Sequence, residues 1–258
     1  MLRACSLGSG SSGNALVVEA RDGSTVTRVL VDDGFNLKQL GRRLERAGLS
    51  LHDIDAVIVT HEHSDHVAGV VRYACKAGVP VYCSEGTAHA AGLLVRGVEW
   101  RELASGVRQE IGALVVDPYE VPHDAAEPLQ FVFGDGERWL GLLTDAGEPT
   151  ALMVAALRRV DALVLECNHD EVMLRTGPYA TFLKVRIAGG RGHLSNAQAA
   201  ALLRLIDCTR LRWVAAAHLS AQNNTKALAC EALAAVLGCG ASDVAVADQE
   251  EGLDWRVV

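Results

Sequence analysis

The stretch AVIVTHEHSDHVAGVV, residues 56–71, decides how this chain folds. Its first four residues are apolar and rich in β-branched side chains, which predicts a short buried strand. From His66 onward, apolar residues recur at helical spacing, which predicts a helix. His61, His63, Asp65 and His66 fall in the loop and helix start between these elements, so four potential metal ligands follow the carboxyl end of a strand.

The spacing of these four side chains suits two metal ions better than one. In an extended loop, His61 and His63 can face the same way, while Asp65 and His66 can turn toward a neighbouring point. Imidazole and carboxylate ligands suit zinc and other first-row divalent ions, and two such ions about 3.5–4 Å apart can share and activate a water. The alternative is a solvated polar loop, which we disfavour because desolvating several imidazoles without a partner costs free energy.

Outward from this loop, strand-like and helix-like segments alternate along most of the chain. The turn at residues 133–136 (FGDG) joins two apolar runs as a hairpin, so part of the sheet structure is antiparallel. We therefore predict an α/β fold with two mixed sheets and helices outside both. Further strand-like runs begin at residues 15, 28, 79, 113, 129, 138, 162, 212 and 243, and helical spacing covers residues 36–48, 66–78, 149–160, 195–206 and 225–237.

Several of these helices carry their own boundary signals. Gly48 and Gly78 follow two of them as C′ residues, and Ser195 with Gln198 forms a capping-box pattern. Pro149 suits the first turn of another helix.

The composition indicates a globular chain with one domain over residues 1–258, since half of the residues are hydrophobic. The 24 basic and 32 acidic residues give a net charge of −8, which argues against broad coating of nucleic acid and leaves room only for a local basic patch. The seven scattered cysteines have no Cys-x-x-Cys spacing, so we expect no disulfide framework. With no signal-peptide pattern and no apolar run of spanning length, we expect a cytoplasmic protein that does not enter the membrane.

The His-x-His-x-Asp-His pattern in THEHSDHVAG resembles the signature motif of the metallo-β-lactamase superfamily. The resemblance implies an αββα sandwich with a dinuclear site, and further ligands on later strand ends. The matching candidates are His123 in EVPHDAAEP, Asp145 in LLTDAG and His218 in AAAHLS. By this resemblance His61, His63 and His123 bind one metal, Asp65, His66 and His218 bind the other, and Asp145 bridges them.

The resemblance extends over most of the chain and narrows the activity. The segments SLGSGSSGN, LECNHD, GPYATFLKVRIAGGRGHLSN and AHLSAQNNT look like the YycJ/WalJ-like branch, which is close to RNase Z, RNase J and phosphodiesterase members. It implies phosphodiester cleavage, with DNA exonuclease action associated with the branch. Asp65 would orient the activated water, and His193 would contact the phosphate or protonate the leaving oxygen. The alternative for His193 is a local role beside the capped helix.

A local basic face supports a nucleic-acid substrate. Residues 172–206 contain five basic residues and no Asp or Glu, which predicts an anion-binding face. The alternative interpretation is an ordinary basic helix surface. The Gly8–Asn14 loop either forms an anion-holding nest or is a turn between strands, and His169 lies either at the rim of the site or in a structural position. The basic residues are Arg175, Lys184, Arg186, Arg191 and Arg204.

The sequence is also compatible with two other functions. The same metal motif serves thioesterases and lactonases of the glyoxalase II kind, and a metal-stabilised scaffold could bind nucleic acid without turnover. The sequence also leaves open zinc versus manganese, DNA versus RNA versus a small phosphodiester, end-directed versus internal cleavage, and the oligomeric state.

Overall fold

Two seven-stranded β-sheets form the centre of the protein in a computed structural model that describes residues 1–258. The first sheet begins with antiparallel strands and continues with parallel ones from β3 to β6. In spatial order it consists of β14 (Leu253–Val257), β1 (Leu2–Gly8), β2 (Ala15–Asp22), β3 (Thr25–Val31), β4 (Ala56–Ile58), β5 (Val81–Cys83) and β6 (Trp100–Glu102).

The second sheet is also mixed. Its strands run parallel from β10 to β13 and antiparallel from β7 to β10, and the β9–β10 hairpin predicted around Asp135 and Gly136 is confirmed. In spatial order it consists of β13 (Ala245–Val246), β12 (Trp213–Ala217), β11 (Ala162–Glu166), β10 (Trp139–Leu143), β9 (Leu129–Gly134), β8 (Leu114–Glu120) and β7 (Gln109–Ile111).

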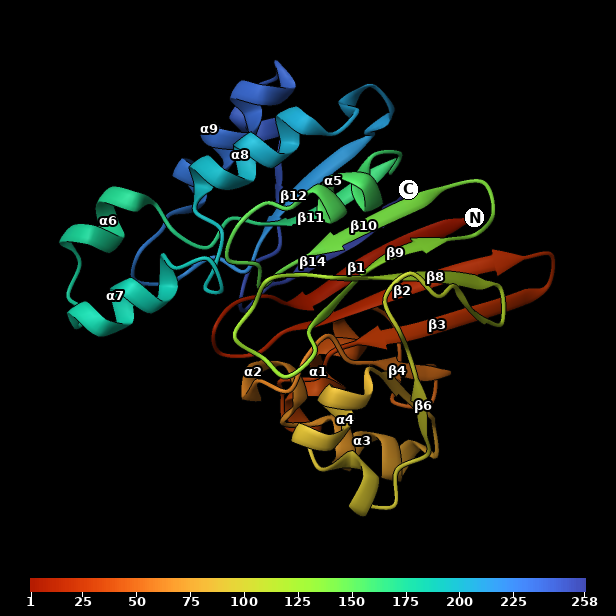
Figure 1. Ribbon diagram of the computed structural model, residues 1–258. Helices are drawn as coiled ribbons and strands as arrows, with labels where there is room; N and C mark the ends of the chain where they lie inside the picture. Colours follow the sequence, from red (N-terminus) through yellow and green to blue (C-terminus); the bar gives the residue numbers. More distant parts are fainter.

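Helices cover the outer faces of both sheets, and one helical pair projects beyond them (Figure 1). None of the helices has the length and apolar character needed to span a bilayer. Beside the first sheet lie α1 (Leu37–Arg46), α2 (Ser64–Val67), α3 (Val70–Ala77) and α4 (Glu85–Ala90); beside the second lie α5 (Ala151–Leu157), α8 (Asn196–Leu205) and α9 (Lys226–Leu237); the projecting pair is α6 (Glu171–Thr176) and α7 (Thr181–Ile187). Short 3₁₀ helices cover Leu93–Val95, Cys208–Arg210 and Ala241–Asp243.

Three separate apolar cores hold these layers together. One lies between the sheets and includes Phe131 and Phe133, another packs α5, α8 and α9 onto the second sheet, and a third packs α1 and α3 onto the first. Three cores between four layers are what an αββα sandwich requires, since each sheet buries both of its faces. The predicted fold class is therefore confirmed.

Most helix boundaries agree with the sequence signals. Gly48 and Gly78 adopt the left-handed conformation after α1 and α3, with φ of 73° and 70°, and Ser195 with Gln198 forms the capping box of α8. The placement of Pro149 in the first turn of a helix is wrong, because Thr150 caps α5 and Pro149 precedes that cap.

The single helix predicted over residues 66–78 is also wrong, since it is split into α2 and α3 around Gly69. The Gly69 N–H donates to the Asp33 carbonyl, and a Cβ at this position would overlap the Phe35 carbonyl oxygen. The close approach of a neighbouring loop therefore breaks a segment whose apolar spacing is continuous.

Candidate metal centre

The carboxyl ends of strands from both sheets meet at one edge of the sandwich. His61 follows β4, Asp145 follows β10 and His218 follows β12. Parallel strands bring their carboxyl ends to a common edge, which is where open α/β sheets usually place ligands. Asp145 and His218 both have φ of 53°, a left-handed conformation that is uncommon for residues with side chains. The chain therefore turns sharply where each of these side chains enters the site.

Three imidazoles converge on one point. His61 Nε2 lies 3.0 Å from His63 Nδ1, and His123 Nε2 lies 3.2 Å from the same atom. His123 Nδ1 donates to the Gly192 carbonyl at 2.9 Å, so its Nε2 is left with a free lone pair. Burial lowers the pKa of both His61 and His123, which favours the neutral rings that bind metals.

A second group lies beside the first. Its ligand atoms are Asp65 Oδ2, His66 Nε2 and His218 Nε2, with the carboxylate oxygen 3.6 Å from His66 and 3.5 Å from His218. The other ring nitrogen of His66, Nδ1, lies 2.8 Å from Asp32 Oδ2. This contact orients the ring so that Nε2 faces the site, as carboxylates commonly do behind metal-binding histidines.

Asp145 reaches both groups. Its Oδ2 lies 3.2 Å from His66 Nε2, and its Oδ1 lies 4.0 Å from His123 Nε2. Asp145 Oδ2 and His218 Nε2 are fully buried, and none of their contacts with neighbouring polar atoms has the geometry of a hydrogen bond. Buried polar atoms are rarely left unpaired. Carboxylate oxygen and imidazole nitrogen are common ligand atoms of divalent first-row metals. The residues therefore fit divalent metal ions.

The protonation pattern shows how much negative charge this edge carries. Burial opposes protonation of His66 and His218, but nearby carboxylates outweigh it, led by Asp145 in both cases. They raise the pKa of His66 well above its usual range and that of His218 to about 10. Burial would raise the pKa of Asp145, but the neighbouring histidines hold it well below its usual range. The buried carboxylates of this edge therefore favour a positive charge next to them.

Glu166 belongs to the site and was not predicted from the sequence. It ends β11 and is fully buried, and its Oε1 lies 2.8 Å from His193 Nδ1 while Oε2 accepts from the backbone N–H groups of Ala146 and Leu194. Burial raises the pKa of Glu166, but His193 outweighs it and lowers the pKa. Its position in the sequence could have identified it, because Glu166 ends an apolar run, as a carboxylate at the same edge of the sheet as Asp145 would.

His193 is placed by Glu166 at the rim of the site. Its side chain is 22% exposed, and it lines a cleft of about 350 Å³ together with His63, Asp65 and Asp145. Because Nδ1 faces the Glu166 carboxylate, Nε2 is the ring nitrogen available to a substrate. Burial lowers the pKa of His193, but Glu166 and Asp145 outweigh it and raise the pKa.

The Gly8–Asn14 loop borders the site, where Ser11 lines the cleft, and it forms a turn whose backbone N–H groups are mostly paired. The backbone N–H groups of five of its residues already donate to protein oxygens. Asn14 Nδ2 lies 3.1 Å from His66 Nε2 and 3.3 Å from the Asp65 carbonyl, so the loop supports the ligands. The five donors are Ser9, Gly10, Ser12, Gly13 and Asn14.

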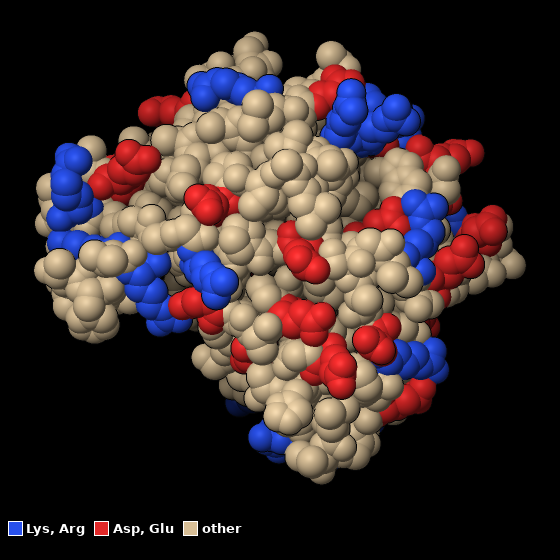
Figure 2. Space-filling view, in the orientation of Figure 1, with Lys and Arg blue, Asp and Glu red and all other residues tan.

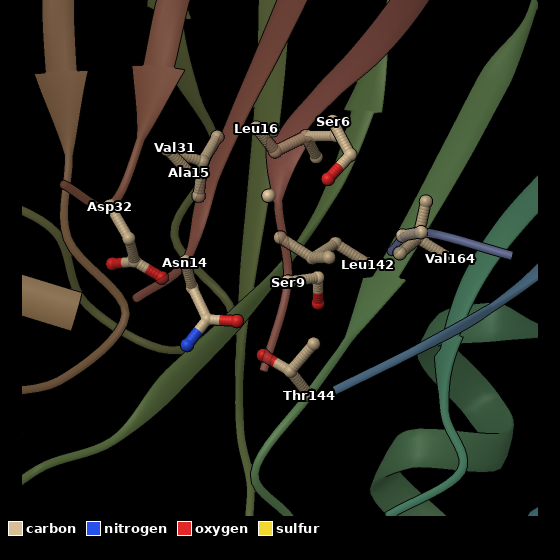
Figure 3. A pocket seen from close by; sticks show the side chains of 12 residues that line it. Ser6, Ser9, Asn14, Ala15, Leu16, Val31, Asp32, Leu142, Thr144 and Val164 are labelled. Carbon is tan, nitrogen blue, oxygen red and sulfur yellow. The ribbon is translucent and has the colours of Figure 1, made fainter. Parts of the chain in front are cut away.

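Figure 3 shows the small cavity between the sheets behind this loop. Ser9, Asn14, Asp32 and Thr144 contribute polar atoms to its wall, and its volume is about 20 Å³. That space is enough for about one water molecule. Asp32, which follows β3 and was also missed from the sequence, therefore lies between this cavity and His66.

Two other candidate residues lie away from the cleft. His169 is buried and lines a separate groove between α6 and α7. Arg204 lies near the end of α8, about 12 Å along the helix axis from Asn196. Arg186 does line the cleft, where it pairs with Asp124 at 2.6 Å.

Comparison with known proteins agrees with the class that this sandwich and its histidine-rich edge define. Residues 27–214 match the family described as "Beta-lactamase superfamily domain". The protein YhfI from Bacillus subtilis, a metallo-beta-lactamase fold protein, superposes with a TM-score of 0.74 at 14% identity, over 100% of both chains.

Two curated relatives cover nearly the whole chain. The protein named Exodeoxyribonuclease YycJ from Bacillus anthracis is 36% identical over 90% of this chain and 87% of its own length. The protein named Exodeoxyribonuclease WalJ from Streptococcus pneumoniae is 33% identical over 97% of this chain and 91% of its own. The chain belongs to the beta-lactamase superfamily, as a metallo-β-lactamase-fold protein of the YycJ/WalJ-like branch.

Proposed function

We propose that this protein is a metal-dependent nuclease that cleaves phosphodiester bonds, with DNA exonuclease-like action, and that residues 1–258 act as one domain. The observation that carries the proposal is the pair of adjacent ligand groups with Asp145 between them. The names of the two relatives that match nearly the whole chain support a nuclease over other hydrolases.

The proposed site holds two divalent ions, zinc or manganese. His61, His63 and His123 would hold one ion, and the buried Asp145 would bridge to the other. When bound, such a pair supplies Lewis-acid stabilisation of the phosphate and a water of lowered pKa. The second ion would be held by Asp65, His66 and His218.

Asp65 and His193 carry out the two proton transfers of the proposed reaction. The Asp65 carboxylate is 23% exposed at the cleft, so it can orient the attacking water and accept its proton. His193, held through Nδ1 by Glu166, presents Nε2 to the leaving oxygen and donates a proton to it. Proton acceptance by Asp65 and proton donation by His193 are then carried out by separate groups that line the same cleft.

Nuclease assays with end-labelled substrates test this function. Purified protein is incubated with end-labelled single-stranded DNA, duplex DNA and RNA in added zinc or manganese, beside the Asp145→Asn variant. We expect products that shorten from one end with DNA, and no cleavage by the variant. Full activity of Asp145→Asn, or hydrolysis of a thioester but of no phosphodiester by the parent protein, would contradict the proposal.

A further inference from the structure

The helical pair α6–α7 forms an arm that projects beyond the sheets (Figure 1). We define the α6–α7 arm as residues 171–188. α7 buries none of its residues, and Phe182 and Val185 are 77% and 67% exposed. A seven-residue helix has marginal stability unless it packs against other elements. A fully exposed aromatic side chain contributes no free energy of hydrophobic burial. The arm therefore has an apolar surface that a bound molecule could cover.

One side of this arm is a wall of the metal-site cleft. Leu183, Arg186 and Ile187 of α7 line the cleft together with His193. Phe182 precedes Arg186 by four residues, so their side chains are neighbours on the helix surface. Arg186 also pairs with Asp124 at 2.6 Å, and Asp124 lies 3.8 Å from His63. Phe182 is thus one helical turn from a side chain that is tied to the site.

The charge of the arm favours a polyanion. Arg175, Lys184 and Arg186 lie on the arm and Arg191 follows it. Glu171 is the one acidic residue of the arm, although the whole chain has a net charge of −8. Figure 2 shows Lys and Arg side chains gathered over α6 and α7, with an acidic group among them, while the rest of the visible face mixes acidic and basic groups. The arm therefore carries a net positive charge, with Arg186 at the cleft and with Arg175 and Lys184 on the adjoining groove between α6 and α7.

The same charges disfavour a second copy of this chain as the occupant. A symmetric dimer centred on α7 would place each patch against itself and would bring Lys184 and Arg175 of both copies together. A single-stranded nucleic acid instead offers phosphates to the cations and unpaired bases to the exposed ring.

We propose that the α6–α7 arm docks a single-stranded segment of the substrate, with a base stacked on Phe182 and phosphates held by Arg175, Lys184 and Arg191. The proposal rests on the proposed nuclease function and names the substrate form that the site receives. A strand held by the arm enters the cleft along Arg186, and its scissile phosphate reaches the metal centre.

Oligonucleotides that carry 2-aminopurine at successive positions from one end test this contact. The fluorescence of this base falls when it stacks, so we expect quenching at one or two positions with the parent protein and none at these positions with Phe182→Ala. The affinity of Phe182→Ala for a single-stranded dodecamer, measured by anisotropy, should fall by about tenfold or more, since stacking on an aromatic side chain typically contributes this much. Phe182→Trp should restore both signals.

Leu205→Ala is the matched control, because Leu205 is an apolar residue, 63% exposed, at the far end of α8. It should bind the dodecamer as the parent protein does. For Phe182→Ala, the loss in kcat/KM on the dodecamer should exceed the loss on bis(p-nitrophenyl) phosphate by about tenfold.

Equal dodecamer affinity in Phe182→Ala and the parent protein would overturn the docking proposal even if cleavage persists. Dissociation of a dimer by Phe182→Ala in sedimentation would overturn it in favour of a second copy. Failure of the parent protein to cleave any phosphodiester, with Phe182-dependent quenching intact, would reject the nuclease function and leave the strand contact standing.

Discussion

Asp32, Asp145 and His218 are the only residues other than glycine with positive φ, at 60°, 53° and 53°. Each lies just after a strand of the site edge. Such conformations cost about 1–3 kcal/mol each and persist where the surroundings enforce them. Here the surroundings are buried hydrogen bonds and neighbouring carboxylates and imidazoles, so the strain coincides with the residues that we propose to bind or orient the metals.

Asp32 is expected to support the ligand His66, because its carboxylate accepts a hydrogen bond from the Thr60 N–H and lies 2.8 Å from His66 Nδ1. Asp32→Asn keeps a side chain that tolerates positive φ but removes the negative charge behind His66. We expect metal affinity to fall by about 10- to 100-fold. Competition with a chromophoric chelator measures this, with Asp22→Asn at the exposed end of β2 as control. Unchanged affinity would show that Asp32 does not support a ligand.

His193 provides a second prediction. Its removal in His193→Ala should lower kcat by about 100- to 10,000-fold, the usual contribution of a positioned acid, while the bound metal stays unchanged. Metal content by plasma mass spectrometry and single-turnover rates test the two parts, and the exposed His52→Ala serves as control. Loss of metal together with activity would instead make His193 a ligand.

Gly69 shows how a single position shapes an element. The segment from His66 to Gly78 has helical spacing throughout, yet α2 and α3 are separated at Gly69, where the Phe35 carbonyl and the Asp33 side chain leave no room for a Cβ. The break allows His66 to face the site while α3 packs its apolar face on the first sheet.

Gly69→Ala should therefore destabilise the protein by about 1–3 kcal/mol, since backbone would have to move to accept the methyl group. Gly41→Ala is the matched control, because a Cβ at Gly41 in α1 meets no atom within 4 Å. That change should raise stability by up to about 1 kcal/mol through helix propensity. Urea unfolding of both variants measures the difference, and equal midpoints would contradict the packing argument.

Glu19 links the strands β1, β2 and β3 through ion pairs with its buried carboxylate. It is fully buried on β2 and pairs with Arg3 of β1 at 2.8 Å, and with Arg21 and Arg28 at 2.7 Å. Burial would raise the pKa of Glu19, but the three arginines outweigh it and lower the pKa from 4.5 to about 2. The folded state therefore binds the Glu19 proton more weakly than the unfolded state does.

The stability from Glu19 should be fully present above about pH 4.5 and lost as the pH falls toward 2, because the unfolded state then takes up the proton first. We expect the Glu19 ion pairs to contribute about 2 kcal/mol to the free energy of unfolding. This is less than they would contribute if the arginines were fully buried, because water screens the exposed parts of their side chains. Glu19→Gln should remove this part of the acid dependence in urea unfolding at pH 3 to 7. An identical pH profile in the variant would show that the pairs contribute nothing.

The sequence by itself determined features that depend on neighbours along the chain. These features are the strand β4, the four ligand candidates that follow it, the β9–β10 hairpin and the capping box of α8, and each arises within about a dozen residues. Resemblance to a known family added His123, Asp145 and His218, and the structure brings all three to the His61 loop. Their roles as ligands stay predictions.

Only the tertiary structure decided which remote groups meet. Glu166 and Asp32 lie behind His193 and His66 because strands from two sheets end at one edge, and no spacing along the chain encodes that meeting. The position of β1 between β14 and β2 and the split at Gly69 have the same origin. In each case a contact between distant segments outweighs the local pattern, because packing and hydrogen bonding across elements contribute more free energy than local propensity.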